Sequence, residues 1–150
     1  MQQEDPNYSR HQEEEPRLTK VPVRMSAQDE RTWSIIAHLS ILLDLITGIG
    51  GPVAALIIWL VYKNRSQKVA FHALQSLWYQ VAWIVILSVG WFITYILMFV
   101  LIGFLLVPVM AIASVIPFVH QCYAAYKISQ GVEYRYPIIA DMVDGERRVA

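Results

Sequence analysis

Apolar residues dominate the chain from Thr32 to Tyr126, and polar or charged residues dominate on both sides of this stretch. Its charged residues are only Asp44, Lys63, Arg65 and Lys68. The 58 residues between Lys68 and Lys127 contain no Asp, Glu, Lys or Arg. One helical membrane span takes about 20 predominantly apolar residues, so this run is long enough for two passes. The pattern predicts an all-α integral membrane protein.

Breaks in the apolar pattern predict four helices. The first follows Ser26, with acidic residues in its first turn, and ends at the sequence TGIGGP, where three glycines and a proline interrupt it. The second begins at Pro52 and ends near Lys63, so the first two helices are short for full spans. They could tilt, extend into the interface or form a shallow hairpin.

The third predicted helix is capped by Ser66 and continues to about Met98. A reversal around residues 101–105 then leads into the fourth helix, which ends before Gly131. Together these helices form a predicted four-helix membrane domain over residues 28–137. Residues 1–27 contain almost no large apolar side chain, which predicts a disordered polar tail. Residues 138–150 are interpreted as a short C-terminal tail.

Basic residues predict the orientation in the membrane. The loop between the second and third helices carries Lys63, Arg65 and Lys68, whereas the loops near Gly50 and Gly103 carry no Lys or Arg. Further basic residues precede the first helix and follow the fourth: Arg24, Arg31, Lys127 and Arg135. By the positive-inside rule, a four-helix transmembrane bundle places every basic cluster on one side. We therefore expect a multi-pass protein of the bacterial cytoplasmic membrane with both termini cytoplasmic.

Composition excludes several classes of function. The formal net charge is zero and no basic patch is present, which argues against a nucleic-acid partner. The single cysteine, Cys122, excludes an intramolecular disulfide. The sequence contains no nucleophile–base pairing and no phosphate-binding loop, so we expect neither an enzyme nor a bound cofactor. The lipid bilayer is the one partner that the composition requires.

Polar residues on the third helix suggest a layer inside the membrane. His72, Gln75, Ser76 and Tyr79 follow the spacing of one helix face, which Gln80 continues. His38 and His120 lie at matching depth, because all three histidines sit roughly 6–11 Å inside a charged flank at 1.5 Å per residue. The face predicts interhelical hydrogen bonding. The alternative is a haem or metal site, which the layer supports less well because it contains no Cys or carboxylate.

Asp44 is the only acidic residue within the apolar region. Counted from Arg31, a continuous first helix would place it near the far interface, beside the glycine-rich turn. A proton-coupled or ion-conducting role would use such a carboxylate, but a residue close to a turn can equally face water. Asp44 is therefore a candidate intramembrane carboxylate.

Four segments carry a resemblance to a known family: DERTWSIIAHLS at 29–40, the Pro52 to Trp59 segment, VAFHALQS at 69–76 and KISQGVEYRYP at 127–137. In order and spacing they resemble a bacterial family of small membrane proteins of unknown function, related to the Tic-twenty subunit of the chloroplast import machinery. The resemblance implies a four-helix membrane domain with both termini inside. It implies no biochemical activity and, by analogy, favours a channel-forming or translocation-associated role.

Three hypotheses for function follow. The preferred one is a non-enzymatic subunit or an assembly or translocation-associated component, with a larger membrane complex or a homo-oligomer as partner. The second is an oligomeric channel or carrier that uses the polar face of the third helix and Asp44. The third is a redox protein in which His38, His72 and His120 bind haem or a metal.

Overall fold

The computed structural model describes residues 25–149, and this part of the chain is all-α, without a β-strand. The elements, in chain order, are α2 (Ala27–Leu39), the 3-10 helix η1 (Ser40–Leu43), α3 (Asp44–Thr47), α4 (Gly50–Tyr62), α5 (Gln67–Met98), α6 (Gly103–Ser129) and α7 (Pro137–Val149). Residues 1–24 of the expected polar tail lie outside the described residues.

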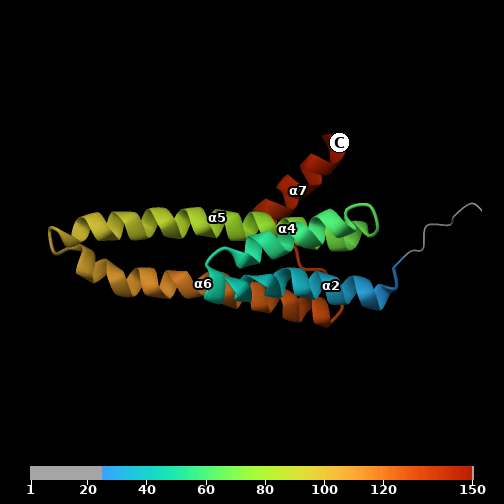
Figure 1. Ribbon diagram of the computed structural model, residues 1–150, viewed down its shortest axis with the longest axis horizontal. Helices are drawn as coiled ribbons and strands as arrows, with labels where there is room; N and C mark the ends of the chain where they lie inside the picture. The colour runs from blue at the N-terminus through green and yellow to red at the C-terminus, as the bar shows by residue number, and fades with distance from the viewer. Residues whose placement is uncertain (1–24, 150) are drawn as a thin grey trace, which may run out of the picture.

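Helices α5 and α6 form a long antiparallel pair that defines the axis of the molecule (Figure 1). Ser66 caps α5, because its hydroxyl accepts the Val69 N–H. With 32 and 27 residues, the two helices are about 48 and 40 Å long at 1.5 Å per residue. Both are long and apolar enough to cross a membrane. At about 48 and 40 Å, both helices are longer than the roughly 30 Å hydrocarbon core of a bilayer.

The turn between α5 and α6 contains no polar side chain. It spans residues 99–102, and Leu101 adopts a positive φ of 65°. Gly103 opens α6 where a Cβ atom would lie 2.4 Å from the backbone of Met98 and of Thr94. Only glycine fits this close approach, which explains why the reversal occurs at the one glycine in the FVLIGFLL run.

The hairpin formed by α2, η1, α3 and α4 covers only about half of the α5–α6 pair (Figure 1). Helix α4 has 13 residues, about 20 Å, which is too short for a full span, and the arm formed by α2, η1 and α3 ends at the same tip. At the tip of this hairpin, Gly51 lies against Gln80, far from the end of α5 at Met98. The structure therefore contains two candidate spans within residues 25–149, where the sequence predicted four.

The first predicted helix runs through α2, η1 and α3 with helical backbone and ends at Gly48. Ser40 Oγ donates to the Ala37 carbonyl at 2.8 Å, where the chain passes from α2 into the 3-10 helix. Asp44 Oδ1 then accepts the Gly51 N–H at 2.7 Å and closes the tip of the hairpin. Gly48, with a φ of 78°, supplies the left-handed residue that the reversal requires. The sequence predicted this end at TGIGGP, but not the 3-10 segment or the contact between Asp44 and Gly51.

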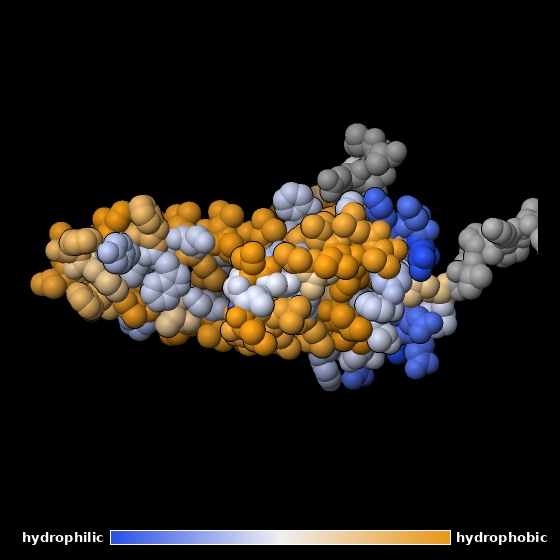
Figure 2. Space-filling model, viewed as in Figure 1, coloured by the Kyte–Doolittle hydropathy of each residue, from blue (hydrophilic) through white to orange (hydrophobic). Residues whose placement is uncertain are grey.

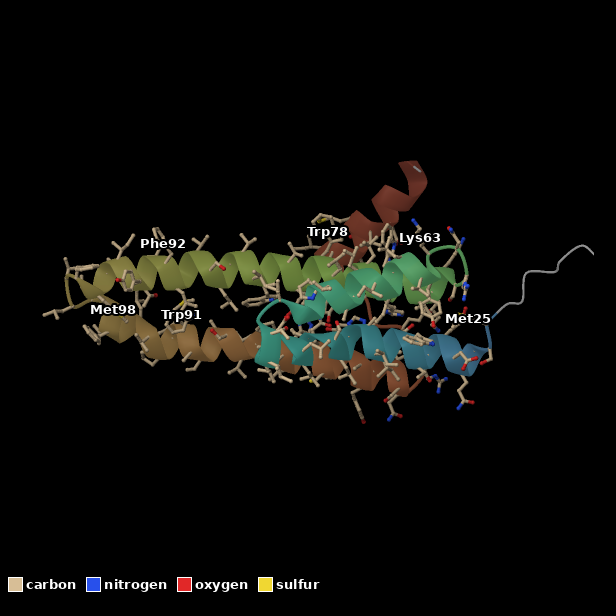
Figure 3. The ribbon with its side chains drawn as sticks, in the orientation of Figure 1. Met25, Lys63, Trp78, Trp91, Phe92 and Met98 are labelled. Atoms are coloured by element: carbon tan, nitrogen blue, oxygen red, sulfur yellow. The ribbon has the colours of Figure 1, made fainter. Side chains whose placement is uncertain are left out.

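Charged and apolar side chains segregate along the axis. Figure 2 shows strongly hydrophilic residues gathered at the end where α2 begins, and a mainly hydrophobic surface with scattered paler patches along the rest of the visible face. At the charged end, Lys68 pairs with Glu133 at 3.5 Å. Along α5, Phe92 is 64% exposed and points away from α6, whereas Trp91 donates its indole N–H to Ser114 of α6 at 3.2 Å (Figure 3). An apolar surface of this length matches lipid rather than water.

Helix α7 occupies the segment that the sequence analysis described only as a short tail. Ala140 and Val143 are buried against Phe71 of α5, whereas Ile138 and Met142 are exposed. Arg135, just before the helix, forms a hydrogen-bonded ion pair with Asp144. This hydrogen bond raises the pKa of the Arg135 guanidinium. The apolar side of α7 thus completes the core at the charged half of the bundle.

Candidate functional site

A buried polar network joins α2, α5 and α6 at the half of the bundle that the hairpin covers. The side chains of His38, His72, Gln75, Ser76 and Gln121 are each at most 1% exposed. His38 comes from α2, Gln121 from α6 and the other three from α5. The polar face of α5 is therefore closed off by its neighbours rather than presented at the surface.

In each hydrogen bond of this network, the donor and the acceptor can be assigned. Gln121 Oε1 accepts from His38 Nδ1 at 2.8 Å, so the neutral ring carries its proton on Nδ1. His38 Nε2 is then an acceptor, and it faces His72 Nδ1 at 3.4 Å. Ser76 Oγ donates to the Ala37 carbonyl at 2.8 Å and accepts from the amides of Gln80 and Gln121 at 2.8 and 3.2 Å. Hydrogen bonds thus connect three helices without any charged group.

A second cluster surrounds His120 of α6. Its Nδ1 lies 2.7 Å from Tyr79 Oη and its Nε2 lies 2.6 Å from Tyr134 Oη. A neutral imidazole has one N–H and one lone pair, so one tyrosine hydroxyl donates to the ring and the other accepts from it. Tyr136 stacks on Tyr79 with ring centroids 4.4 Å apart.

Tyr136 connects the two groups of residues. Its ring contacts those of His38 and His120, with centroid distances of 5.7 and 4.8 Å, and its hydroxyl lies 3.4 Å from His38 Nδ1. Burial raises the pKa of the Tyr136 phenol, so this hydroxyl remains protonated. The structure thereby places all three histidines of the expected layer in one region, with His120 linked through tyrosines rather than directly.

Asp44 lies apart from this layer, at the tip of the hairpin. Its carboxylate lies beside Gln80, midway along α5. Its Oδ1 accepts the Gly51 N–H, and its Oδ2 faces the same space as Gln80 Oε1. The sequence identified this carboxylate and its place beside the glycine-rich turn, but it could not name Gln80 as its neighbour, because that contact depends on how the hairpin packs against α5.

Hydrogen bonding is the chemistry that this arrangement supports. Within the described residues, no group of three or more His, Cys, Asp or Glu side chains is placed to hold a metal ion. His38 Nε2 and His72 Nδ1, 3.4 Å apart, are therefore a pair of imidazoles without a third such ligand among these residues. Both ring nitrogens of His120 already face tyrosine hydroxyls.

Sequence reasoning missed several members of the network. Gln121 follows the noted His120 directly, so its polar character inside an apolar helix was the available signal. Ser40 accepts the Gln80 amide at 3.1 Å and was absent from the expected layer. Tyr134 and Tyr136 follow the end of α6, and nothing in their spacing indicated that the chain would fold back over α5.

Residues 29–143 match the model of the magnetosome magnetite crystal formation protein family. The match covers more than half of the chain, and the protein therefore belongs to this family. The resemblance to the family related to the Tic-twenty import subunit is thereby corrected: the segments that suggested it fall within the magnetosome family match. No curated protein and no solved structure matches the chain.

Proposed function

We propose that this protein is a non-enzymatic component of the magnetosome membrane that supports magnetite crystal formation as a structural or assembly subunit. The family match supports the process, and the apolar surface of α5 and α6 supports the membrane location. The observation that carries the non-enzymatic part is the buried network. Its histidines, glutamines and serines bond to one another across α2, α5 and α6, which suits a role in holding helices together.

In this proposal α5 and α6 cross the membrane, and the α2–α4 hairpin enters it only from the charged side. Lys63, Lys68 and Lys127 then lie on one side, which the positive-inside rule assigns to the cytoplasm. Two crossings keep both ends of the described chain on that side, as expected from the sequence. The four-helix bundle remains as a packing arrangement in the cytoplasmic half, without four full crossings.

The channel or carrier hypothesis has less support. The polar face of α5 would have to line a path, but His72, Gln75, Ser76 and Gln80 are at most 1% exposed and bond to α2, η1, α6 and the chain that follows it. A path along this face would require the hairpin to leave its place. The haem or metal hypothesis has less support because His38 and His72 have no third His, Cys, Asp or Glu ligand among the described residues.

Cysteine accessibility tests the topology. In a background with Cys122 replaced by Ala, cysteines at residues 65 and 145 should react with an impermeant thiol reagent from the cytoplasmic side only. A cysteine at residue 101 should react only from the opposite side. A cysteine at residue 49, at the hairpin tip, should react from neither side because the tip ends within the bilayer. Labelling of residue 49 from the opposite side would instead establish four crossings.

Complementation tests the non-enzymatic role. In a magnetite-forming bacterium lacking this gene, crystal number and size should be measured by electron microscopy after restoring wild-type protein or the Ser76→Ala and His120→Gln variants. For a structural subunit, crystal formation should follow the amount of folded protein in the membrane. A variant present at the wild-type level but unable to restore crystals would contradict the proposal and point to chemistry at the altered side chain.

A further inference from the structure

Two side-chain oxygens converge on Gly51 at the tip of the hairpin. A Cβ atom at Gly51 would lie 2.5 Å from Gln80 Oε1 and 2.8 Å from Asp44 Oδ2, so both oxygens face the same small space. The other carboxylate oxygen, Asp44 Oδ1, is already satisfied by the Gly51 N–H at 2.7 Å. An acceptor of α3 and an acceptor of α5 therefore both border the position of a Gly51 Cβ.

Gln80 is 1% exposed, and its Oε1 has no hydrogen-bond partner among the described residues. Its Nε2 donates to Ser40 Oγ at 3.1 Å and to Ser76 Oγ at 2.8 Å. Both hydroxyls donate their own protons to the Ala37 carbonyl, so they serve Gln80 as acceptors. This fixes the amide with its oxygen toward Asp44. A buried acceptor left without a donor is costly, so the site requires one.

No described cation faces Asp44. The elements packed against α3 are η1, α4 and, through Gln80, α5. Their other titratable groups are Tyr62, Lys68, His72, Tyr79 and Tyr95. Tyr62 and Lys68 lie at the charged end, Tyr95 lies near the opposite end of α5, and His72 and Tyr79 face His38 and His120. An ionised carboxylate here would lack a partner at membrane depth, where charge is expensive.

We propose that Asp44 is a proton-binding site, in which Oδ2 carries a proton and donates it to Gln80 Oε1. One proton then satisfies the buried amide oxygen, neutralises the carboxylate and joins the hairpin tip to α5. Loss of that proton to water leaves two acceptors opposite each other and an unpaired charge, which loosens the tip. The inference rests on the proposed membrane placement of the hairpin and is independent of the role in crystal formation.

Infrared spectroscopy of the full chain in lipid nanodiscs tests the protonation state. With isotope-labelled aspartate, the wild type at neutral pH should show the carbonyl band of a protonated carboxylic acid. The band should be absent from Asp44→Asn and retained in Asp141→Asn, which alters an exposed aspartate of α7. In Gln80→Leu the band should move to higher frequency, because the acid loses its acceptor.

Thermal unfolding tests the hydrogen bond separately. Asp44→Asn places an amide N–H where the proposed O–H stands, so it should keep the wild-type melting temperature, whereas Asp44→Leu should lower it by several degrees. The folded state binds the proton more tightly than the unfolded state, so stability is present at low pH and is lost as pH rises. The wild type should show this loss, and Asp44→Asn should not.

Three results would overturn the proposal. One is a wild-type protein without the acid band at neutral pH. Another is an Asp44→Asn variant as unstable as Asp44→Leu, which would mean that a charged carboxylate is needed. The third is stabilisation of the wild type, but not of Asp44→Asn, by magnesium, manganese or ferrous salts. That result would assign the two oxygens to a metal cation instead of a proton.

Discussion

Replacement of Ser76 by Ala is the most direct test of the polar network, because it removes one oxygen without creating a large cavity. Three hydrogen bonds meet at this hydroxyl: it donates to the Ala37 carbonyl and accepts from the amides of Gln80 and Gln121. Without the Ser76 hydroxyl, the Ala37 carbonyl still accepts from Ser40 Oγ, and the Gln80 amide still donates to Ser40 Oγ. The Gln121 amide has no other donor contact within the described residues, so it becomes the unsatisfied group.

The expected loss follows from these contacts. Two of the bonds join different helices, and such bonds average about 0.6 kcal/mol each in membrane proteins. Burying the unsatisfied Gln121 amide adds about 1 kcal/mol or more. We therefore expect Ser76→Ala to lower the free energy of unfolding by about 2 kcal/mol.

Unfolding by a denaturing detergent, followed by circular dichroism, measures this loss. Ser88→Ala is the matched control, because Ser88 lies exposed on the same helix, and it should change stability by less than about 0.5 kcal/mol. Combining Ser76→Ala with Gln121→Leu should cost less than the sum of the two single changes, since the unsatisfied amide is then gone. A Ser76→Ala variant as stable as the control would refute the network as a source of stability.

Three further outcomes are expected. Gly51→Ala should destabilise the protein by about 1–3 kcal/mol, because its Cβ would meet Gln80 and Asp44. Gly145→Ala is the control and should not destabilise it, because a Cβ there meets nothing within 4 Å, and detergent unfolding measures both variants. Tyr134→Phe should remove one partner of His120 and shift its imidazole nitrogen resonances in NMR, without moving those of His72. Deleting residues 138–150 should expose Phe71 and lower the melting temperature.

Helix α5 shows what the sequence predicts well. Its start at Ser66 and its end near Met98 were expected from one capping residue and the loss of the apolar pattern, and the structure agrees. The face carrying His72, Gln75, Ser76 and Tyr79 was expected to turn toward neighbouring helices, because polar groups inside a membrane need partners. The partners themselves could not be named, since pairing between α2, α5 and α6 depends on how the helices pack.

The hairpin shows where the sequence is insufficient. The first helix and its end at TGIGGP were expected, and the helical backbone runs to Thr47. The contacts that place its tip were not expected: Asp44 accepts the Gly51 N–H, and Gly51 lies against Gln80. These contacts depend on α4 and α5, which lie later in the chain. A count of residues from Arg31 therefore gave the length of the first helix, but not how far α5 and α6 extend beyond its tip.

The depth of Asp44 connects the fold to the proposals above. If the hairpin crossed the membrane, this carboxylate would lie at the far surface, where water could hydrate it and no proton would need to be held. Because the hairpin stops beside Gln80, midway along a helix of about 48 Å, the same residue lies near the middle of the apolar stretch. In the proposed arrangement with two crossings, the position of the hairpin tip thus gives Asp44 a buried amide oxygen as its neighbour in place of solvent.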